Sequence, residues 1–543
     1  MAGMGLPYGL QSMLKEGHKH FAGVEEAVLR NIEACKNMAQ ITRTSLGPNG
    51  MNKMVINHLE RLFVTSDAST IVTELEINHP AARLLVHGAK AQEQEIGDGT
   101  NLVLALGGEL LGGAEGLLRD GLVTAEVTDG YYKASAKALE ILESLILPNS
   151  NDMDIRNQQE VAERLQGTIS SRVSGYEGIL SKLVAEACVG VLPKNPYNFN
   201  VDNVRVVKIP GGGLADSRVV KGMVFRRDAE GTIKHVENAK VAVFAQGVDT
   251  ATTDTKGTVL IKTAEELENY SKSEESKLEE YIKNIANTGV KLVVSGTNIG
   301  EMAMHFLEKY EIMVLRLSSK FELLRLCKAT GAAARSTFGT PSPDEIGFVK
   351  QLTVQELGGA NCCVLLQEAA LGSISTICLR GSTEGQLDDV ERAINNAVNA
   401  FKALTRDARC LAAGGAAEME IARQLQEWSK SQTGLEQYAI NKFAEAFEVV
   451  PRTLAENSGL NATDVVSALY AAHAQGQALA GVDVDGGPPK DLSKESILDV
   501  YMTKWWAIRL ATDAACTVLK VDQIIMSKQA GGPKPRGPGG DED

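Results

Sequence analysis

The sequence predicts a multidomain α/β fold in which a mixed region of helices and strands is inserted into a mainly helical domain. Residues 1–145 and the segment after residue 384 have helical periodicity and are rich in Ala. Residues 200–380 contain short runs rich in Val and Ile and bounded by Gly, which are typical of strands. The 543 residues also exceed one domain of typical size. The order helical, mixed, helical implies a discontinuous domain whose two halves meet in space.

The N-terminal part is predicted to be helical with one short pair of extended runs. Residues 21–45 have apolar side chains at helical spacing, and the LGP tripeptide at residues 46–48 ends the helix with a Gly followed by a Pro. Two extended runs, MVIN and RLFVTSD, lie within residues 51–75. Helices then continue over residues 80–145, where LPNSND marks a boundary.

The middle of the chain contains six runs that predict strands: VDNVRVVKI, VAVFAQ, KLVVSG, IMVLRLS, NCCVLLQ and STICLRG. KLVVSG and IMVLRLS enclose the helix NIGEMAMHFLEKY and predict a βαβ unit.

A very polar helix is predicted between two of these strands. It opens with a capping box of Thr263 and Glu266 and contains charge pairs such as Glu279 with Lys283. Because so polar a helix gains little from a core, its pattern favours a solvated surface helix, and the alternative is a mobile protrusion.

Helices resume over residues 384–480, and WAIRLATDAACTVLKVDQII predicts a helix followed by a strand. Residues 528–543 are rich in Gly and Pro and charged, so we expect a disordered tail. The helix that contains VERAINNAVNAFK carries two adjacent asparagines, Asn395 and Asn396, which are poor helix formers. Periodicity places Asn396 on the polar face, which by itself favours a solvated side chain over one aimed at a ligand.

Composition excludes several classes of function. The net charge is -14, and no stripe of Lys and Arg is interleaved with aromatic residues, so we expect no nucleic-acid partner. We also expect no membrane association, because the longest apolar stretch, NLVLALGGELLGGAEGLL, is interrupted by Glu109 and Glu115. Eight scattered cysteines without a CxxC pair predict reduced, mostly buried thiols in a cytosolic protein.

Two loops that contain Gly could approach a phosphate group. TSLGPNG ends a helix without a bulky side chain. EIGDGT places Asp98 and Thr100 at the start of a helix, where a carboxylate could hold Mg²⁺ against ATP phosphates and the helix N-terminus could meet the anion. Each loop alone is more often an ordinary turn. The sequence contains no GxxxxGK[ST], which argues against a standard P-loop enzyme.

Eight motifs along the chain occur together in a particular order. They are TSLGPNGMNKMV, TSDASTIV, HPAARLLV, GDGT, RGSTE with DDVERA, GGAAE, PRTLAENSG and WAIRLATDAACTVLKVDQII. In this conjunction the chain resembles the group II chaperonins over essentially its whole length, and several details are most similar to the eukaryotic cytosolic members.

The resemblance implies a chaperonin fold with three domains. The mainly helical, discontinuous equatorial domain would comprise residues 1–148 and 405–527. A small intermediate hinge domain would comprise residues 149–214 and 372–404. The α/β apical domain, residues 215–371, would bind substrates and carry a helical lid protrusion that includes the polar helix.

The resemblance also implies an activity, that of an ATP-dependent molecular chaperone with ATP and Mg²⁺ as cofactors. Its partners would be paralogous subunits in a hetero-oligomeric double ring of eight-membered rings, and non-native proteins such as actin and tubulin. Closure driven by ATP would enclose these proteins, and reopening would follow hydrolysis around the ring. The complex would be located in the cytoplasm.

Individual roles follow residue by residue from the resemblance. Asp98 matches the Mg²⁺ ligand, Asp67 a carboxylate near the γ-phosphate, and Asp499 the residue that holds the ribose. The remaining residues matched to the nucleotide are Leu46, Gly47, Pro48, Gly97, Gly99, Thr100, Asn101, Arg172 and Gly415. Arg172 stands where the family usually has a Lys that senses the γ-phosphate.

The main departure from the family is at Asn396. Counting from the matched Thr383–Glu384 pair places this amide at the position of the family's catalytic aspartate. An aspartate can accept the proton of the attacking water, whereas an amide is a negligible base. Asp389 lies two turns away, roughly 10 Å along the axis, too far to substitute. The resemblance therefore implies a subunit that binds Mg-ATP and hydrolyses it slowly or not at all, unless the helix is shifted by one position or another carboxylate serves.

Two other functions stay open on the sequence. A soluble ATPase or kinase that acts on a small molecule would be a monomer or small oligomer, and a stacked double ring in an electron micrograph would exclude it. A ring subunit that keeps its nucleotide and serves as a scaffold would combine low hydrolysis with intact assembly.

Overall fold

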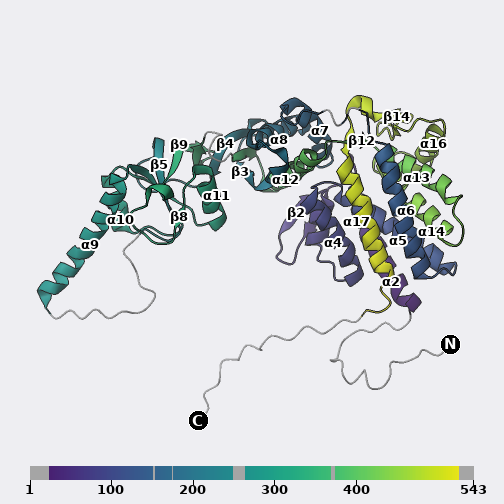
Figure 1. The fold of residues 1–543 in the computed structure, drawn as a ribbon, viewed down its shortest axis with the longest axis horizontal. Helices are drawn as coiled ribbons and strands as arrows, with labels where there is room; N and C mark the ends of the chain where they lie inside the picture. Colours follow the sequence, from purple (N-terminus) through teal and green to yellow (C-terminus); the bar gives the residue numbers. More distant parts are fainter. Residues whose placement is uncertain are drawn as a thin grey trace, which may run out of the picture. The chain divides into compact units, whose positions relative to one another are not determined.

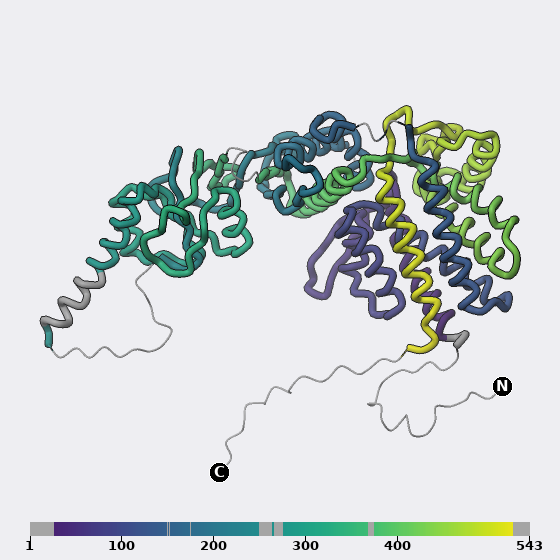
Figure 2. The backbone as a smooth tube through the Cα atoms, viewed as in Figure 1, coloured from purple at the N-terminus to yellow at the C-terminus, as the bar shows by residue number. Residues whose placement is uncertain are grey.

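The computed structural model describes residues 24–148, 150, 153–173, 175–248, 263–367 and 374–524, without the side chains of 24–26 and 265–274. The chain divides into two compact units. Unit 1 comprises Met1–Glu95, Gly99–Leu147 and Cys410–Asp543. Unit 2 comprises Ile96–Asp98 and Pro148–Arg409. The N- and C-terminal parts thus meet in one unit (Figure 2), as the order of elements requires. The finer division into equatorial, intermediate and apical domains stays a prediction.

Unit 1 is a helical bundle with three small two-stranded sheets. Its helices are α2 (Val24–Arg43), α3 (Ala68–Glu74), α4 (Pro80–Glu95), α5 (Thr100–Arg119), α6 (Thr124–Ser144), α13 (Ala416–Ser429), α14 (Glu436–Ala446), α15 (Val449–Asn457), α16 (Ala462–Ala474) and α17 (Tyr501–Leu519). Helix α17 packs against α4, α5 and α6 (Figure 1), so the last helix of the chain completes the core begun by the first ones.

The sheets of unit 1 are antiparallel pairs. They join β1 (Lys53–Ile56) to β2 (Leu62–Thr65), β12 (Cys410–Ala412) to β15 (Leu498–Val500), and β13 (Ala480–Gly481) to β14 (Lys490–Asp491). The first pair confirms the two extended runs expected before residue 75.

Helix α5 forms the centre of the unit 1 core. It is long and apolar enough to span a membrane by length and composition, although 56% of its most apolar window is buried inside the protein. Leu104, Leu106 and Leu110 are fully buried in the cluster formed by the surrounding helices. This burial is typical of a core helix, because a helix that is apolar on all sides is stable in water only when other elements cover it.

Unit 2 is built on a nine-stranded sheet. Its order is β3 (Val204–Pro210), β11 (Ser375–Gly381), β4 (Arg218–Phe225), β10 (Ala360–Leu366), β9 (Gly347–Leu357), β5 (His235–Phe244), β6 (Val290–Ser295) and β7 (Met313–Arg316), with β8 (Ala334–Arg335) beside β5. Strands β6 and β7 are parallel and enclose α10 (Glu301–Lys309), which confirms the predicted βαβ unit. The six predicted strands are present.

Four further helices of unit 2 complete its framework. They are α7 (Gln158–Ser170), α8 (Glu177–Val191), α11 (Lys320–Thr330) and α12 (Glu384–Arg406). Helices α7 and α8 pack against each other and both pack against α12, and Lys208 on β3 forms ion pairs with Asp388 and Glu391 of α12. These contacts fix which face of α12 is covered.

The expectation that the polar helix gains little from a core is wrong for its second half. This helix is α9 (Ala264–Asn287), and Leu278, Ile282 and Ile285 are buried in a cluster with β5, β6 and α10. Glu279 pairs with Lys309 of α10 at 2.6 Å rather than with Lys283 as its hydrogen-bonding partner. The apolar residues recur at three- to four-residue spacing, so they form a narrow buried stripe that the surrounding charges conceal in the sequence.

The expected strand after the last helix is absent from the described residues. Helix α17 ends at Leu519, and residues 521–524 form no strand, since no partner strand lies beside them in this part of the chain. The tail at 528–543 and the Glu266 side chain lie outside the described parts.

The eight cysteines are all free thiols, as predicted. Only Cys327 is partly exposed, and burial raises the pKa of Cys363 to about 12. A buried thiol whose pKa is raised in this way is a poor nucleophile, and Cys363 contributes to packing.

Candidate functional site

The first Gly-containing loop, around Gly47, follows α2 and packs against α15. Gly47 has φ +85°, and a Cβ on it would lie 2.4 Å from Leu454 Cδ2. The Asn457 amide donates to the Leu46 carbonyl oxygen at 2.8 Å, which ties the loop to α15. Only Gly meets both demands, a left-handed backbone and close approach, which is the backbone arrangement that phosphate-binding loops use.

Asp67 is buried at the N-terminus of α3. Its Oδ2 accepts hydrogen bonds from the Thr70 backbone N–H at 3.2 Å and from Thr70 Oγ1 at 2.7 Å. The carboxylate therefore caps the helix and is fixed in orientation. If Asp67 also lies near the γ-phosphate, as the resemblance implies, the same carboxylate must both cap α3 and face the phosphate.

The second loop begins α5. Gly99 is the N-cap residue with φ +76°, and within the described chain no side chain caps the helix there. Asn101 Nδ2 donates to the Thr42 carbonyl oxygen at 3.0 Å, which ties α5 to α2. The buried Asn101 Oδ1 and Thr503 Oγ1 have no hydrogen-bond partner among the described residues. A helix N-terminus without a side-chain cap, next to the unpaired Asn101 and Thr503 oxygens, fits a polar, anionic ligand, and Thr100 is the first residue of that helix.

Gly415 and Asp499 lie on adjoining elements of unit 1. Gly415 is the N-cap of α13 with φ +81°, and a Cβ there would lie 3.1 Å from Pro451 Cβ. Asp499 pairs across the small sheet with Leu411, four residues before Gly415. The sheet thus brings the loop and the carboxylate together.

A buried ion-pair cluster supports Asp499. Lys504 Nζ lies 2.9 Å from Asp499 Oδ2 and 2.9 Å from Glu418 Oε2, and both Lys504 and Glu418 are 3% exposed. Burial alone would lower the pKa of Lys504, but the two carboxylates raise it above its usual range. Sequence reasoning missed this cluster. Its signal was a Glu and a Lys on otherwise apolar helices, where an isolated charge is costly.

In unit 2 the predicted site residues Asp98 and Gly97 contact α7 and α12, respectively. Thr168 Oγ1 donates to Asp98 Oδ2 at 3.1 Å, which orients this carboxylate. Gly97 has φ +81°, and a Cβ on it would lie 2.6 Å from the Asn396 carbonyl oxygen. Gly97 therefore permits the loop to press directly on α12 beside Asn396.

Arg172, which follows α7, contacts Asn396. In the amide orientation that satisfies both groups, Asn396 Oδ1 accepts from Arg172 Nη1 at 2.8 Å and from Nη2 at 3.0 Å. Asn396 is only 4% exposed, whereas Asn395 is exposed. The expectation of a solvated Asn396 is thus wrong, because α7 and the Gly97 loop cover that side of α12. Two residues predicted from separate parts of the chain meet here.

Asp98 is a candidate metal ligand without a preformed cage. Among the described residues no group of three or more His, Cys, Asp or Glu could hold a metal ion. This fits Mg²⁺, which typically binds through one or two carboxylates together with phosphate oxygens and water.

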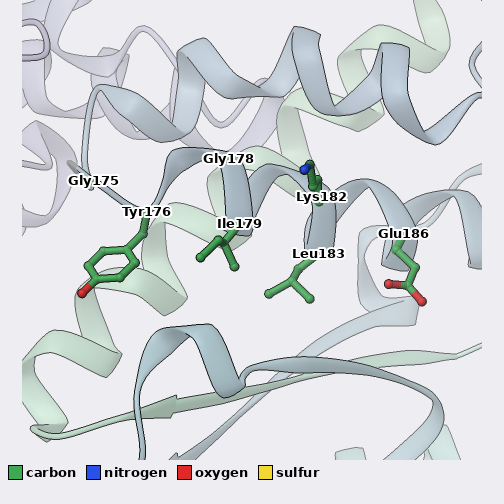
Figure 3. Close-up of a pocket in the computed structure, with 7 residues that line it drawn as sticks. All are labelled: Gly175, Tyr176, Gly178, Ile179, Lys182, Leu183 and Glu186. Carbon is green, nitrogen blue, oxygen red and sulfur yellow. The ribbon is translucent and has the colours of Figure 1, made fainter.

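A separate pocket of about 400 Å³ lies on α8 and contains none of the predicted site residues. Figure 3 shows Tyr176, Ile179 and Leu183 on one side of the helix, with Glu186 farther along it. Its lining is mostly apolar, with Lys182 and Glu186 as its charged residues.

Comparisons with known proteins identify the family of the chain. The model of the TCP-1/cpn60 chaperonin family matches residues 38–529. The chain is 56% identical over 535 residues to T-complex protein 1 subunit theta of Arabidopsis thaliana, which covers 98% of this chain and 97% of that protein. It is 52% identical to subunit theta of Dictyostelium discoideum, over 97% and 98% of the two chains. It is also 52% identical to subunit theta of Homo sapiens, over 98% and 97%. The chain belongs to the TCP-1/cpn60 chaperonin family.

Proposed function

We propose that this chain is an ATP-dependent subunit of a cytosolic double-ring chaperonin, assembled with paralogous subunits, that encloses non-native proteins and assists their folding. The near full-length similarity to theta subunits supports this proposal. Actin and tubulin are candidate substrates through the family resemblance alone.

The nucleotide is assigned to two sets of residues. In unit 1 these are the loop around Gly47, the start of α5 at Gly99 and Thr100, and the Gly415 loop with Asp499. In unit 2 they are Asp98, Arg172 and Asn396 with their supporting contacts. The role of each residue in nucleotide binding rests on the family resemblance.

The candidate Mg²⁺ ligand is Asp98, oriented by Thr168 at 3.1 Å. When bound, the ion would offset the negative charge of the phosphate groups. The protein would contribute the fixed carboxylate, the backbone N–H groups at the start of α5 and the guanidinium of Arg172.

Slow hydrolysis is the more specific part of the proposal, and one observation carries it. The residue at position 396 is a buried amide whose oxygen is occupied by the Arg172 guanidinium. Such an amide cannot accept a proton from water, and loss of a general base typically costs about 10² to 10⁴ in rate. The subunit would then bind ATP and retain it, while positioning and electrostatic effects support a low residual rate.

Binding of Mg-ATP to the purified full-length chain tests the first part of the proposal. We expect saturable binding that weakens when Mg²⁺ is omitted, and also in Asp98→Asn, while the exposed carboxylate change Asp513→Asn leaves it unchanged. Equal binding by Asp98→Asn and the native chain would remove Asp98 from the site. Electron microscopy of the complex purified from cells tests assembly, and a chain found only as a monomer would contradict a ring subunit.

A further inference from the structure

The contact between Arg172 and Asn396 uses both terminal nitrogens of the guanidinium. Nη1 and Nη2 lie 2.8 and 3.0 Å from a single amide oxygen. The backbone holds Arg172 in place, because its N–H donates to the Ile169 carbonyl oxygen at 3.0 Å in the turn that ends α7. Asn396 therefore belongs to a packed helix, and Arg172 belongs to the hydrogen-bonded turn that follows α7.

Asp has nearly the same shape as Asn, but replacing Asn396 by Asp would change the hydrogen bonds that this side chain makes with Arg172. A planar guanidinium pairs with a carboxylate through two parallel hydrogen bonds, one to each oxygen. In Asn396 the two nitrogens converge on one oxygen, but a carboxylate that turns to accept one hydrogen bond on each oxygen would have both of its oxygens engaged by Arg172. The nearby positive charge of Arg172 would also lower the pKa of this carboxyl group and so weaken it as a base.

A lysine at position 172 would behave differently. Its ammonium group is a compact charge on a flexible stem, with three donors that can rotate, and it lacks the fork that matches a carboxylate. One carboxylate oxygen would stay available to water. This difference makes the identity of residue 172 decisive for what residue 396 can do.

We propose that Arg172 and Asn396 are a matched pair, in which Arg172 prevents a carboxylate at position 396 from acting as a base. Efficient hydrolysis then needs two changes together, Arg172→Lys and Asn396→Asp. In the doubly changed chain the carboxylate takes one proton from water as the water oxygen bonds to the terminal phosphorus and the bond to ADP breaks. Arg172 is thus a positioning residue that acts through residue 396, and this inference rests on the proposed ATPase function.

Single-turnover hydrolysis with limiting labelled ATP tests the pairing in four full-length chains: native, Asn396→Asp, Arg172→Lys and the double variant. We expect the double variant to be about 10² times faster than the native chain or more, and Asn396→Asp alone to gain less than about tenfold. Arg172→Lys alone should gain nothing, since the amide is still no base. Asn395→Asp is the matched control, because it adds a carboxylate one residue away on the exposed side of α12, and we expect no gain.

The pH dependence separates a catalytic effect from a structural one. The rate of the double variant should rise as the carboxylate ionises, and in Asn396→Asp the same rise should lie at lower pH. If Asn396→Asp alone matches the double variant, the pairing is wrong although slow hydrolysis through Asn396 is right. If every chain binds Mg-ATP but the double variant gains nothing, the pairing is also wrong, while nucleotide binding stands. Failure of all chains to bind Mg-ATP would contradict the proposed function itself. If the double variant does not fold, Asn396→Asp with Arg172→Gln replaces it with the same expectation.

Discussion

A buried polar side chain lies beside a cationic one in each unit, but the buried group is a carboxyl group in unit 1 and an amide in unit 2. In unit 1, Glu418 is 3% exposed and its carboxyl group lies 2.9 Å from Lys504 Nζ. In unit 2, residue 396 is 4% exposed and faces a guanidinium at 2.8 Å, yet it is an amide. Buried carboxylates are therefore tolerated where a cation compensates them, and a cation is present in both places. The cost of burial does not account for an amide at position 396, which points to function rather than stability.

The largest expected effect is the loss of the cation in unit 1. Lys504→Met would leave Glu418 buried without its partner, and breaking a buried pair costs about 3 to 5 kcal/mol. Chemical denaturation should show this loss in unfolding free energy, whereas Lys494→Met, at an exposed site, should change little. Comparable stability of both variants would mean that the unit 1 cluster is not the charged one described.

A second change probes the neighbouring carboxylate on α13. Burial alone would raise the pKa of Glu420, but hydrogen bonds from His473 and Arg423 lower it to about 2. A depressed carboxyl pKa contributes stability above its unfolded value near 4.5, and this contribution is lost as pH falls toward 2.

We therefore expect the urea midpoint of the native chain to fall between pH 4.5 and 2 more steeply than that of Glu420→Gln, which has no carboxyl to protonate. Parallel curves for the two chains over this range would contradict the assigned pKa.

A smaller effect is expected at the amide of unit 2. Asn396→Ala would remove an acceptor from the partly buried guanidinium of Arg172, which typically costs about 1 to 3 kcal/mol. Asn395→Ala is its control, because the same substitution at the exposed neighbour removes no buried hydrogen bond. If the two variants have the same unfolding free energy, Asn396 does not make the stabilising contact with Arg172.

The smallest effect is predicted for Asn396→Asp. Because Arg172 already supplies a charge partner, the new ion pair should roughly balance its own desolvation and leave stability within about 1 kcal/mol of the native chain at pH 7. A loss as large as that of Lys504→Met would show that burial alone excludes a carboxylate here, and the comparison between the two units would fail.

Sequence periodicity predicted most elements of both units, because apolar spacing follows directly from helix and strand geometry. Strand β9 was missed although Val349 and Leu352 are buried and Phe348 is exposed, since interspersed Lys and Gln mask the alternation. Strand β4 contains Lys221 and a central Gly222, which weaken its strand signal.

The site residues show a different limit. Motifs named the individual positions, but spacing along α12 placed Asn396 toward solvent because a single helix does not reveal what covers it. The covering groups, Gly97 and Arg172, lie hundreds of residues away in the chain. The Lys504 cluster was missed for the same reason, since its partner Glu418 is on another helix.

The central claim is that this chain binds ATP and that the pair at positions 172 and 396 withholds hydrolysis. The most direct test is a chemical-quench measurement of labelled Mg-ATP bound to the native chain and to Arg172→Lys/Asn396→Asp. We predict that both chains bind the nucleotide and that only the doubly changed one converts it rapidly to ADP, with rate constants about 10² apart or more. Equal rate constants for two chains that bind ATP equally well would contradict the claim.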